Sequence, residues 1–114
     1  NLLKGLKPST RQRFVSTRFD FPGAEREISI LIGETGCDAD LAKRLVGIAK
    51  AFRALKDRDL EEVASTRLLV YAATLIKSGF DVTAACRAAL VESLTDDEET
   101  VEALMEIVNA TFGR

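Results

Sequence analysis

The 114-residue sequence predicts one mainly α-helical domain preceded by a single β-strand. Apolar residues recur with helical spacing from residue 24 onward, and residues 14–21 alternate in character as in a strand. Ser, Asp and Gly residues stand where the helices are expected to begin and end. Hydrophobic residues make up 46% of the chain and charged residues 30%, which is typical of a soluble globular domain and excludes a disordered chain. The length predicts one domain, and the lack of a long apolar run predicts no membrane span.

The predicted strand runs from Phe14 to Phe21 and is ended by Pro22 and Gly23. One side of it carries Val15, Thr17, Phe19 and Phe21, and the other carries Ser16, Arg18 and Asp20. A single strand is not stable by itself, so we expect its partner strands to come from outside this chain. The chain also begins at Asn1 without a methionine. Both observations predict a piece of a longer protein.

Five helices are predicted after Gly23, and the first two precede a polar break at residues 56–62. The first ends at Gly36 and carries one apolar face formed by Ala24, Ile28, Leu31 and Ile32. The second begins at Asp38 or Asp40. Its core stripe consists of Leu41, Leu45, Ile48, Phe52 and Leu55.

The last three helices follow the polar break. The third runs from Ser65 to Gly79, with an apolar face of Leu68, Leu69, Ala72, Leu75 and Ile76. The fourth begins at Asp81 or Thr83, and its core residues are Ala84, Ala85, Ala88 and Leu90. The fifth begins at Thr95 or Asp96 and ends at Gly113, with Val101, Leu104, Met105, Val108 and Phe112 facing the core. Five amphipathic helices of this length can close a small bundle.

The composition excludes several kinds of catalytic and binding site. The chain has no histidine, which excludes histidine triads and histidine metal sites. It has no GxxxxGK[ST], GxGxxG, GxSxG or CxxC motif, so it lacks the usual glycine-rich cradle for a nucleotide. Its two cysteines, Cys37 and Cys86, are expected to be small core residues or partly exposed ones. With no export signal, they favour a cytoplasmic location.

The net charge of −2 conceals two oppositely charged ends. Residues 1–19 contain five basic residues and no acid, whereas residues 92–106 contain seven acids and no base. This asymmetry predicts an anion site near the start or head-to-tail contacts between copies, and the alternative is two solvated surfaces of opposite sign. We expect no nucleic-acid partner, because the net charge is negative and the few aromatic residues near the start belong to the strand.

Two arginine patterns are candidates for binding phosphate. In KPSTRQRF (residues 7–14), Arg11 and Arg13 flank a glutamine just before the strand. Arginine suits phosphate because its planar, always charged fork donates to two oxygens. In ASTR (residues 64–67), Arg67 lies in the first turn of a helix, where the helix dipole disfavours a cation. A broken local preference is a sign of function, although all three arginines could simply be solvated.

Three stretches of the sequence resemble the C-terminal part of the CbbQ/NirQ/NorQ proteins, which belong to the MoxR group of AAA+ ATPases. They are LKPSTRQRFVSTRFDFP (6–22), DLEEVASTRLLVYAATLI (59–76) and ACRAALVESLTDD (85–97), in the family's order. The resemblance covers essentially the whole chain. It implies that residues 1–22 are the tail of an AAA+ core, with its arginine-finger segment and last core strand. Residues 23–114 would then be the C-terminal helical lid.

The resemblance also implies roles for the arginines and for the whole protein. Arg13 is the candidate arginine finger, with Arg11 as its neighbouring alternative, and Arg67 is the candidate sensor-2 residue that binds ATP. The full-length protein would use ATP and Mg²⁺ in a homo-oligomeric, hexameric ring. It would act with a partner protein carrying a von Willebrand A domain on a target enzyme of the rubisco or nitric oxide reductase type. This chain alone is expected to hold neither ATP nor Mg²⁺ and to be inactive.

A different kind of function is possible for the same bundle. It could be a stand-alone helical protein-interaction module that docks through its acidic C-terminal helix and has no ATPase activity. Such a module should be indifferent to ATP.

Overall fold

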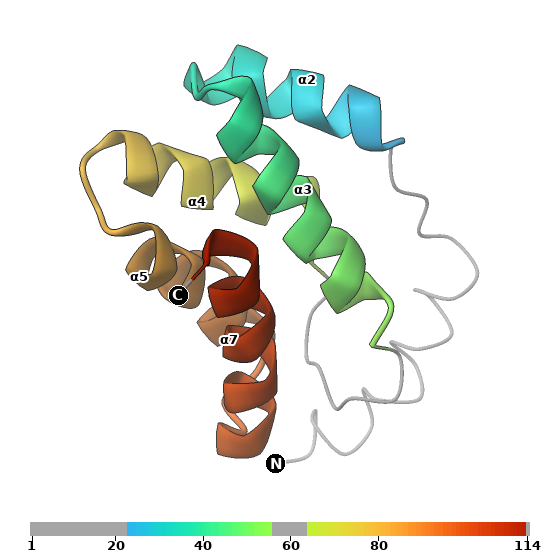
Figure 1. Ribbon diagram of the computed structural model, residues 1–114, viewed down its shortest axis with the longest axis vertical. Coiled ribbons are helices and arrows are strands. Elements are labelled where there is room, and N and C mark those ends of the chain that lie inside the picture. The colour runs from blue at the N-terminus through green and yellow to red at the C-terminus, as the bar shows by residue number, and fades with distance from the viewer. Residues whose placement is uncertain (1–22, 56–63, 114) are drawn as a thin grey trace, which may run out of the picture.

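The computed structural model describes residues 23–55 and 64–113, and all regular structure in these two ranges is helical (Figure 1). The elements are α2 (Ala24–Thr35), α3 (Ala39–Arg53), α4 (Thr66–Lys77), α5 (Val82–Cys86), the π-helical η1 (Arg87–Val91), α6 (Glu92–Leu94) and α7 (Glu98–Phe112). Since α5, η1 and α6 follow one another without a break, the described residues form five helical rods. This confirms the prediction of a bundle of about five helices. The predicted strand, residues 14–21, lies outside the described residues.

Helices α3 and α4 form the middle of the bundle. Helix α2 packs across both of them on one side, while α7 packs against α3 and against the rod formed by α5 and η1 on the other (Figure 1). The fully buried side chains come from every rod and include Leu31, Leu45, Phe52, Leu69, Leu90 and Leu104. Burying each of them stabilises the fold by about 1.5–3 kcal/mol relative to leaving it exposed.

Polar caps fix where the helices begin, largely as the sequence predicts. Asp38 accepts the Leu41 N–H at 2.8 Å at the start of α3. Ser65 and Asp81 cap α4 and α5 in the same way. Two helices end on glycines with positive φ, Gly36 after α2 at 74° and Gly113 after α7 at 73°. Glycine suits these positions because it lacks the Cβ that penalises the left-handed conformation.

The prediction for the start of α7 was wrong by one or two residues. The cap is Asp97, whose carboxylate accepts the Thr100 N–H at 2.9 Å, rather than Thr95 or Asp96. Thr95 is buried and extended, and its hydroxyl accepts the Asp97 N–H at 3.1 Å. Thr95 therefore shapes the turn before the helix instead of capping the helix.

The predicted apolar face of α2 is corrected in part. Leu31 is fully buried, but Ala24 is exposed and Ile32 is 37% exposed. The second buried residue of α2 is Glu27, one helical turn before Leu31. A hydrophobicity pattern misses a buried carboxylate because the pattern assigns charged residues to the surface.

The predicted core face of the fourth helix is also corrected. Ala84 and Ala88 are exposed, whereas Ala85, Cys86, Ala89, Leu90 and Val91 are buried. Ala84 precedes η1 and is exposed because the buried face of α5 is formed by Ala85 and Cys86. Ala88 lies within η1, and a π-turn holds more residues than an α-turn and so rotates the side chains within and after it. The same widening brings Arg87 and Glu92, five residues apart, into an ion pair of 3.1 Å.

No helix among the described residues is long and apolar enough to cross a membrane.

Candidate functional site

The start of α4 carries Arg67, which is the only one of the three predicted site arginines within the described residues. Ser65 is the cap, Thr66 the first helical residue and Arg67 the second. The Arg67 side chain is exposed and makes no ion pair with any other described residue. Arg11 and Arg13 lie outside the described residues, so their relation to Arg67 stays a prediction.

The first turn of α4 combines two sources of positive charge. The N–H groups of Leu68 and Leu69 donate to the Ser65 carbonyl at 3.1 and 3.3 Å, which is the usual pattern of a helix start. The positive end of the helix dipole lies at this turn, and the first turn contains no acidic residue. The Arg67 guanidinium adds a full charge and a planar set of donors. This turn is therefore suited to an anion such as a phosphate.

A group of polar side chains around one buried carboxylate, which we call the Glu27 cluster, lies beside this turn. It consists of Glu27 from α2, Arg53 from α3 and Thr66 from α4. Arg53 donates through Nη2 to Glu27 Oε2 at 2.6 Å and through Nη1 to Oε1 at 3.0 Å. The Thr66 hydroxyl donates to the same Oε2 at 2.7 Å. The cluster therefore joins three helices at one carboxylate.

Arg53 also holds the chain just before α4. Its Nε donates to the carbonyl oxygen of Ala64 at 2.8 Å, in addition to the two hydrogen bonds from its Nη atoms to Glu27. Planar guanidinium geometry permits this, because the donors of one arginine point along different edges of the fork. The backbone at Ala64 and the side chain of Thr66 are thus fixed on either side of the cap residue Ser65.

The electrostatics of the Glu27 cluster favour an ionised carboxylate. Glu27 is only 1% exposed. Burial raises the pKa of Glu27, but the hydrogen bonds from Arg53 and Thr66 and the positive charge of Arg53 lower it more. The net result is a pKa below the ordinary value of 4.5. Glu27 and Arg53 therefore form a buried salt bridge at neutral pH, and breaking such a pair typically costs about 3–5 kcal/mol.

Sequence reasoning missed Glu27 and Arg53. The available signal was that Glu27 precedes the core residue Leu31 by four positions and so lies on the same face of a helix. Arg53 lies in the last turn of α3, where a cation is favoured by the helix dipole and needs no other explanation. Without the fold, nothing in the sequence pairs two residues that are 26 positions apart.

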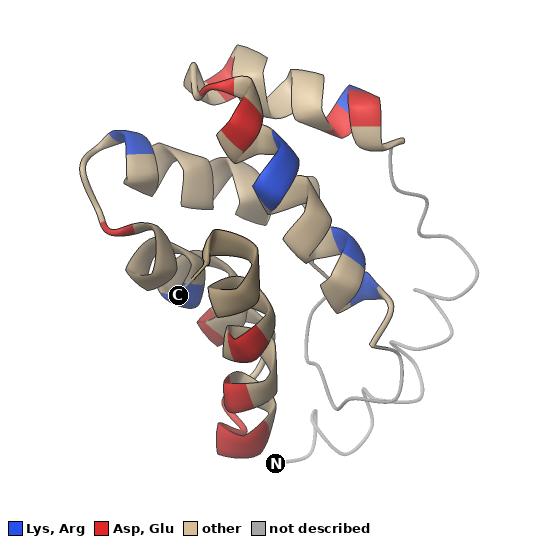
Figure 2. Cartoon of the chain, in the orientation of Figure 1, with Lys and Arg blue, Asp and Glu red and all other residues tan. Residues whose placement is uncertain are grey.

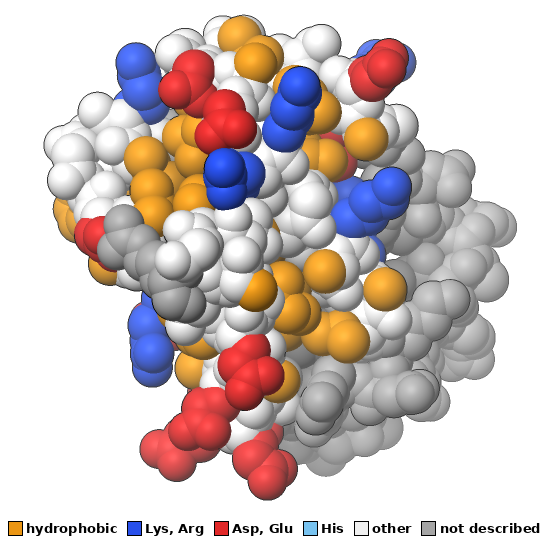
Figure 3. Space-filling model, in the orientation of Figure 1, with side chains coloured by type: hydrophobic (Ala, Val, Ile, Leu, Met, Phe, Trp, Pro, Cys, Tyr) orange, Lys and Arg blue, Asp and Glu red, His pale blue; other side chains and the backbone are white. Residues whose placement is uncertain are grey.

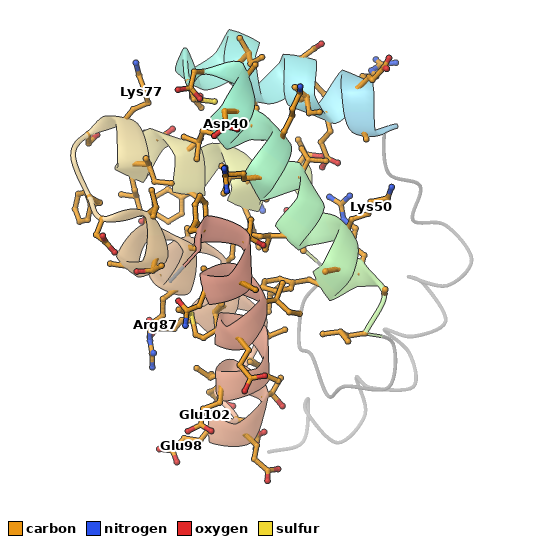
Figure 4. All side chains as sticks on the ribbon, viewed as in Figure 1. Asp40, Lys50, Lys77, Arg87, Glu98 and Glu102 are labelled. Carbon is orange, nitrogen blue, oxygen red and sulfur yellow. The ribbon has the colours of Figure 1, made fainter. Side chains whose placement is uncertain are left out.

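A second charged surface lies at the start of α7. Figure 2 shows acidic residues along this helix, and Glu98 and Glu102 point away from the bundle in Figure 4. In the space-filling view, red side chains gather at this end of the molecule (Figure 3). Glu98 and Glu99 are exposed and lie in the first turn, where acids are favoured by the dipole.

The described residues offer a cation for a phosphate but no ligand set for a metal. No group of three or more Cys, Asp or Glu residues within 23–55 and 64–113 is arranged to hold a metal ion. Arg67 can supply positive charge to an anion at the start of α4.

Comparison with known proteins places this chain in a family. The sequence matches the family described as "CbbQ/NirQ/NorQ C-terminal" over residues 27–111. It is 62% identical over 109 residues to the denitrification regulatory protein NirQ of Pseudomonas aeruginosa, with 96% of this chain and 42% of NirQ covered. It is 50% identical over 113 residues to protein NorQ of Paracoccus denitrificans, with 99% of this chain and 42% of NorQ covered.

A more distant relative is protein CbbQ of Hydrogenophilus thermoluteolus, which is 44% identical over 110 residues, with 96% of this chain and 41% of CbbQ covered. The chain thus spans less than half the length of the curated relatives that it matches. The family match includes Glu27, Arg53 and Arg67 within its bounds. On this evidence the chain belongs to the CbbQ/NirQ/NorQ C-terminal family.

Proposed function

We propose that this chain is the C-terminal lid portion of a MoxR-type AAA+ ATPase. The full-length protein uses ATP hydrolysis to activate or remodel a target enzyme of the rubisco or nitric oxide reductase type. The observation that carries the proposal is the state of Arg67. It is exposed on the first turn of α4, against the preference of the helix dipole, while the backbone around it is fixed by the buried Glu27 cluster. Membership of the CbbQ/NirQ/NorQ C-terminal family supports the same assignment.

In this proposal Arg67 is the sensor-2 residue. Its guanidinium binds the phosphate oxygens of the nucleotide and neutralises their charge, and phosphoryl transfer depends mainly on positioning and on such neutralisation. When bound, ATP would supply the phosphoryl group, and Mg²⁺ would supply a second positive charge beside that of Arg67. Because Arg67 belongs to the lid, its contact with phosphate links the presence of nucleotide to the position of the whole bundle.

The proposal includes partners that this chain does not contain. Arg13, or its neighbour Arg11, acts as an arginine finger on the nucleotide of the next subunit in a hexameric ring. The ring is cytoplasmic and works with a partner protein that carries a von Willebrand A domain. These parts of the proposal rest on the family resemblance.

The experiment that tests the proposal compares two charge deletions on one helix in the full-length protein. Arg67→Ala removes the cation at the start of α4, and the control Lys77→Ala removes the exposed cation in its last turn. Lys77 points into solvent in Figure 4. We expect Arg67→Ala to lower ATP turnover by about 10²-fold, as for the loss of one group that stabilises developing charge, with assembly unchanged. Lys77→Ala should turn over ATP like the unmodified protein, and equal turnover in both variants would contradict the sensor role.

A further inference from the structure

The Glu27 cluster holds the start of α4 at two points that flank its cap residue. Arg53 Nε binds the carbonyl oxygen of Ala64, and Glu27 Oε2 binds the hydroxyl of Thr66. Thr66 directly precedes Arg67, so the backbone that carries Arg67 is anchored from two other helices. The Arg67 side chain itself remains exposed.

This arrangement separates the anchor from the binding group. An exposed arginine loses side-chain freedom when it binds an anion, and any freedom of its backbone would add to that loss. Because the Glu27 cluster fixes the backbone before any ligand binds, binding does not have to restrict the backbone as well. It also ties α4 to α2 and α3, which pack against each other and against α4. Arg67 therefore moves together with these three helices.

We propose that the Glu27 cluster is a positioning device for Arg67. Glu27 and Arg53 never contact nucleotide; they fix the first turn of α4 through Thr66 and Ala64, so that Arg67 reaches phosphate from one defined backbone position. The inference rests on the proposed function of Arg67 and adds the residues that make it effective. Thr66 is the link, because its hydroxyl is the side-chain contact between the helix of Arg67 and the buried carboxylate.

The decisive variant is Thr66→Val in the full-length protein. Valine keeps the branched shape of threonine and leaves the Glu27–Arg53 pair in place, but it removes the hydroxyl that donates to Glu27. The matched control is Thr74→Val on the same helix. The Thr74 hydroxyl is exposed and donates to the Val70 carbonyl of its own helix at 2.8 Å. Both variants lose one threonine hydroxyl, but only Thr66→Val loses a contact between helices.

We expect the effects of Thr66→Val and Arg67→Ala on ATP turnover not to add. Thr66→Val should turn over ATP about tenfold more slowly, the size expected for a hydrogen bond to a charged group whose whole effect falls on positioning. Thr74→Val should be unchanged. The double variant Thr66→Val/Arg67→Ala should be no slower than Arg67→Ala, because a positioning residue has nothing to position once Arg67 is gone.

Other outcomes separate this inference from the proposed function. If Arg67→Ala is slow but Thr66→Val is not, the positioning role is overturned and the sensor role stands. Full additivity of the two substitutions overturns the positioning role as well. If Arg67→Ala turns over ATP normally, both are overturned.

Amide hydrogen exchange gives a readout apart from activity. The Leu68 and Leu69 amides, which bond to Ser65, should exchange faster in Thr66→Val than in Thr74→Val. Slow turnover with unchanged exchange would overturn the inference, because the loss would not come from a released first turn.

Discussion

The first turns of α4 and α7 differ in where their threonine hydroxyls find a hydrogen-bond partner. Each has a polar cap and a threonine in its first turn. In α7 the threonine is Thr100, whose hydroxyl donates to the cap Asp97 of the same turn at 2.8 Å. In α4 the threonine is Thr66, whose hydroxyl donates to Glu27 of another helix.

The charges of the two turns differ as well. Helix α7 begins with Glu98 and Glu99, which the dipole favours, whereas α4 has no acid in its first turn and carries Arg67 there. Where the local preference is obeyed, the threonine hydroxyl bonds to the cap of its own turn. Where it is broken, a buried ion pair supplies the restraint. This difference is the reason that we propose a function for the start of α4.

The largest effect is expected when the restraint on the start of α4 is removed. Arg53→Ala leaves the Glu27 carboxylate buried without its guanidinium and should lower the free energy of unfolding of the chain by about 3–5 kcal/mol, measured by urea denaturation. The control is Arg87→Ala, which breaks the exposed pair with Glu92 and should cost less than about 1 kcal/mol. Equal losses in the two variants would show that the buried pair carries no special restraint.

The restraint should also depend on pH in one direction. Because the pKa of Glu27 lies below 4.5 in the folded chain, its ionised form stabilises the fold above that pH. The contribution is lost as the pH falls through the folded pKa and Glu27 takes up a proton. We expect the difference in unfolding free energy between the chain and Glu27→Gln to be constant from pH 7 to about 5 and to shrink below the ordinary value of 4.5. A difference that is the same at pH 3 and pH 7 would contradict a lowered pKa of Glu27 in the folded chain.

Removing the two caps should have similar effects on stability but different effects on activity. Asp97→Ala and Ser65→Ala should each lower the free energy of unfolding by about 0.5–2 kcal/mol. In the full-length protein, only Ser65→Ala should also slow ATP turnover, because its helix start carries Arg67. The comparison fails if Asp97→Ala slows turnover as much as Ser65→Ala.

Much of this fold was predictable because it follows from local rules. The caps Asp38, Ser65 and Asp81 and the terminal glycines Gly36 and Gly113 were correct, since each depends on only a few neighbouring residues. The errors arose where a non-local effect decides. The π-turn η1 changes the period of its rod, so the predicted core residue Ala88 is exposed.

The residues of the candidate site also differ in whether local rules could predict them. Arg67 could be selected from the sequence because a cation in the first turn of a helix opposes the dipole within a few residues. Glu27 could not, because its burial makes sense only with Arg53, which the fold brings to it from another helix. Its charge assigned it to the surface, and only the packing of α2, α3 and α4 reverses that assignment.

The variant Arg67→Glu tests directly whether Arg67 serves function at the expense of local stability. In one preparation of the full-length protein, ATP turnover and the unfolding midpoint should be measured together. Glutamate suits the positive end of the α4 dipole, so the midpoint should stay the same or rise, with a gain of about 0.3–1 kcal/mol. Turnover should fall by about 10²-fold or more, because a carboxylate repels phosphate where a guanidinium binds it. Normal turnover would contradict a functional role of Arg67. A lowered unfolding midpoint together with slow turnover would also contradict it, because the loss of turnover would then follow from a loss of stability.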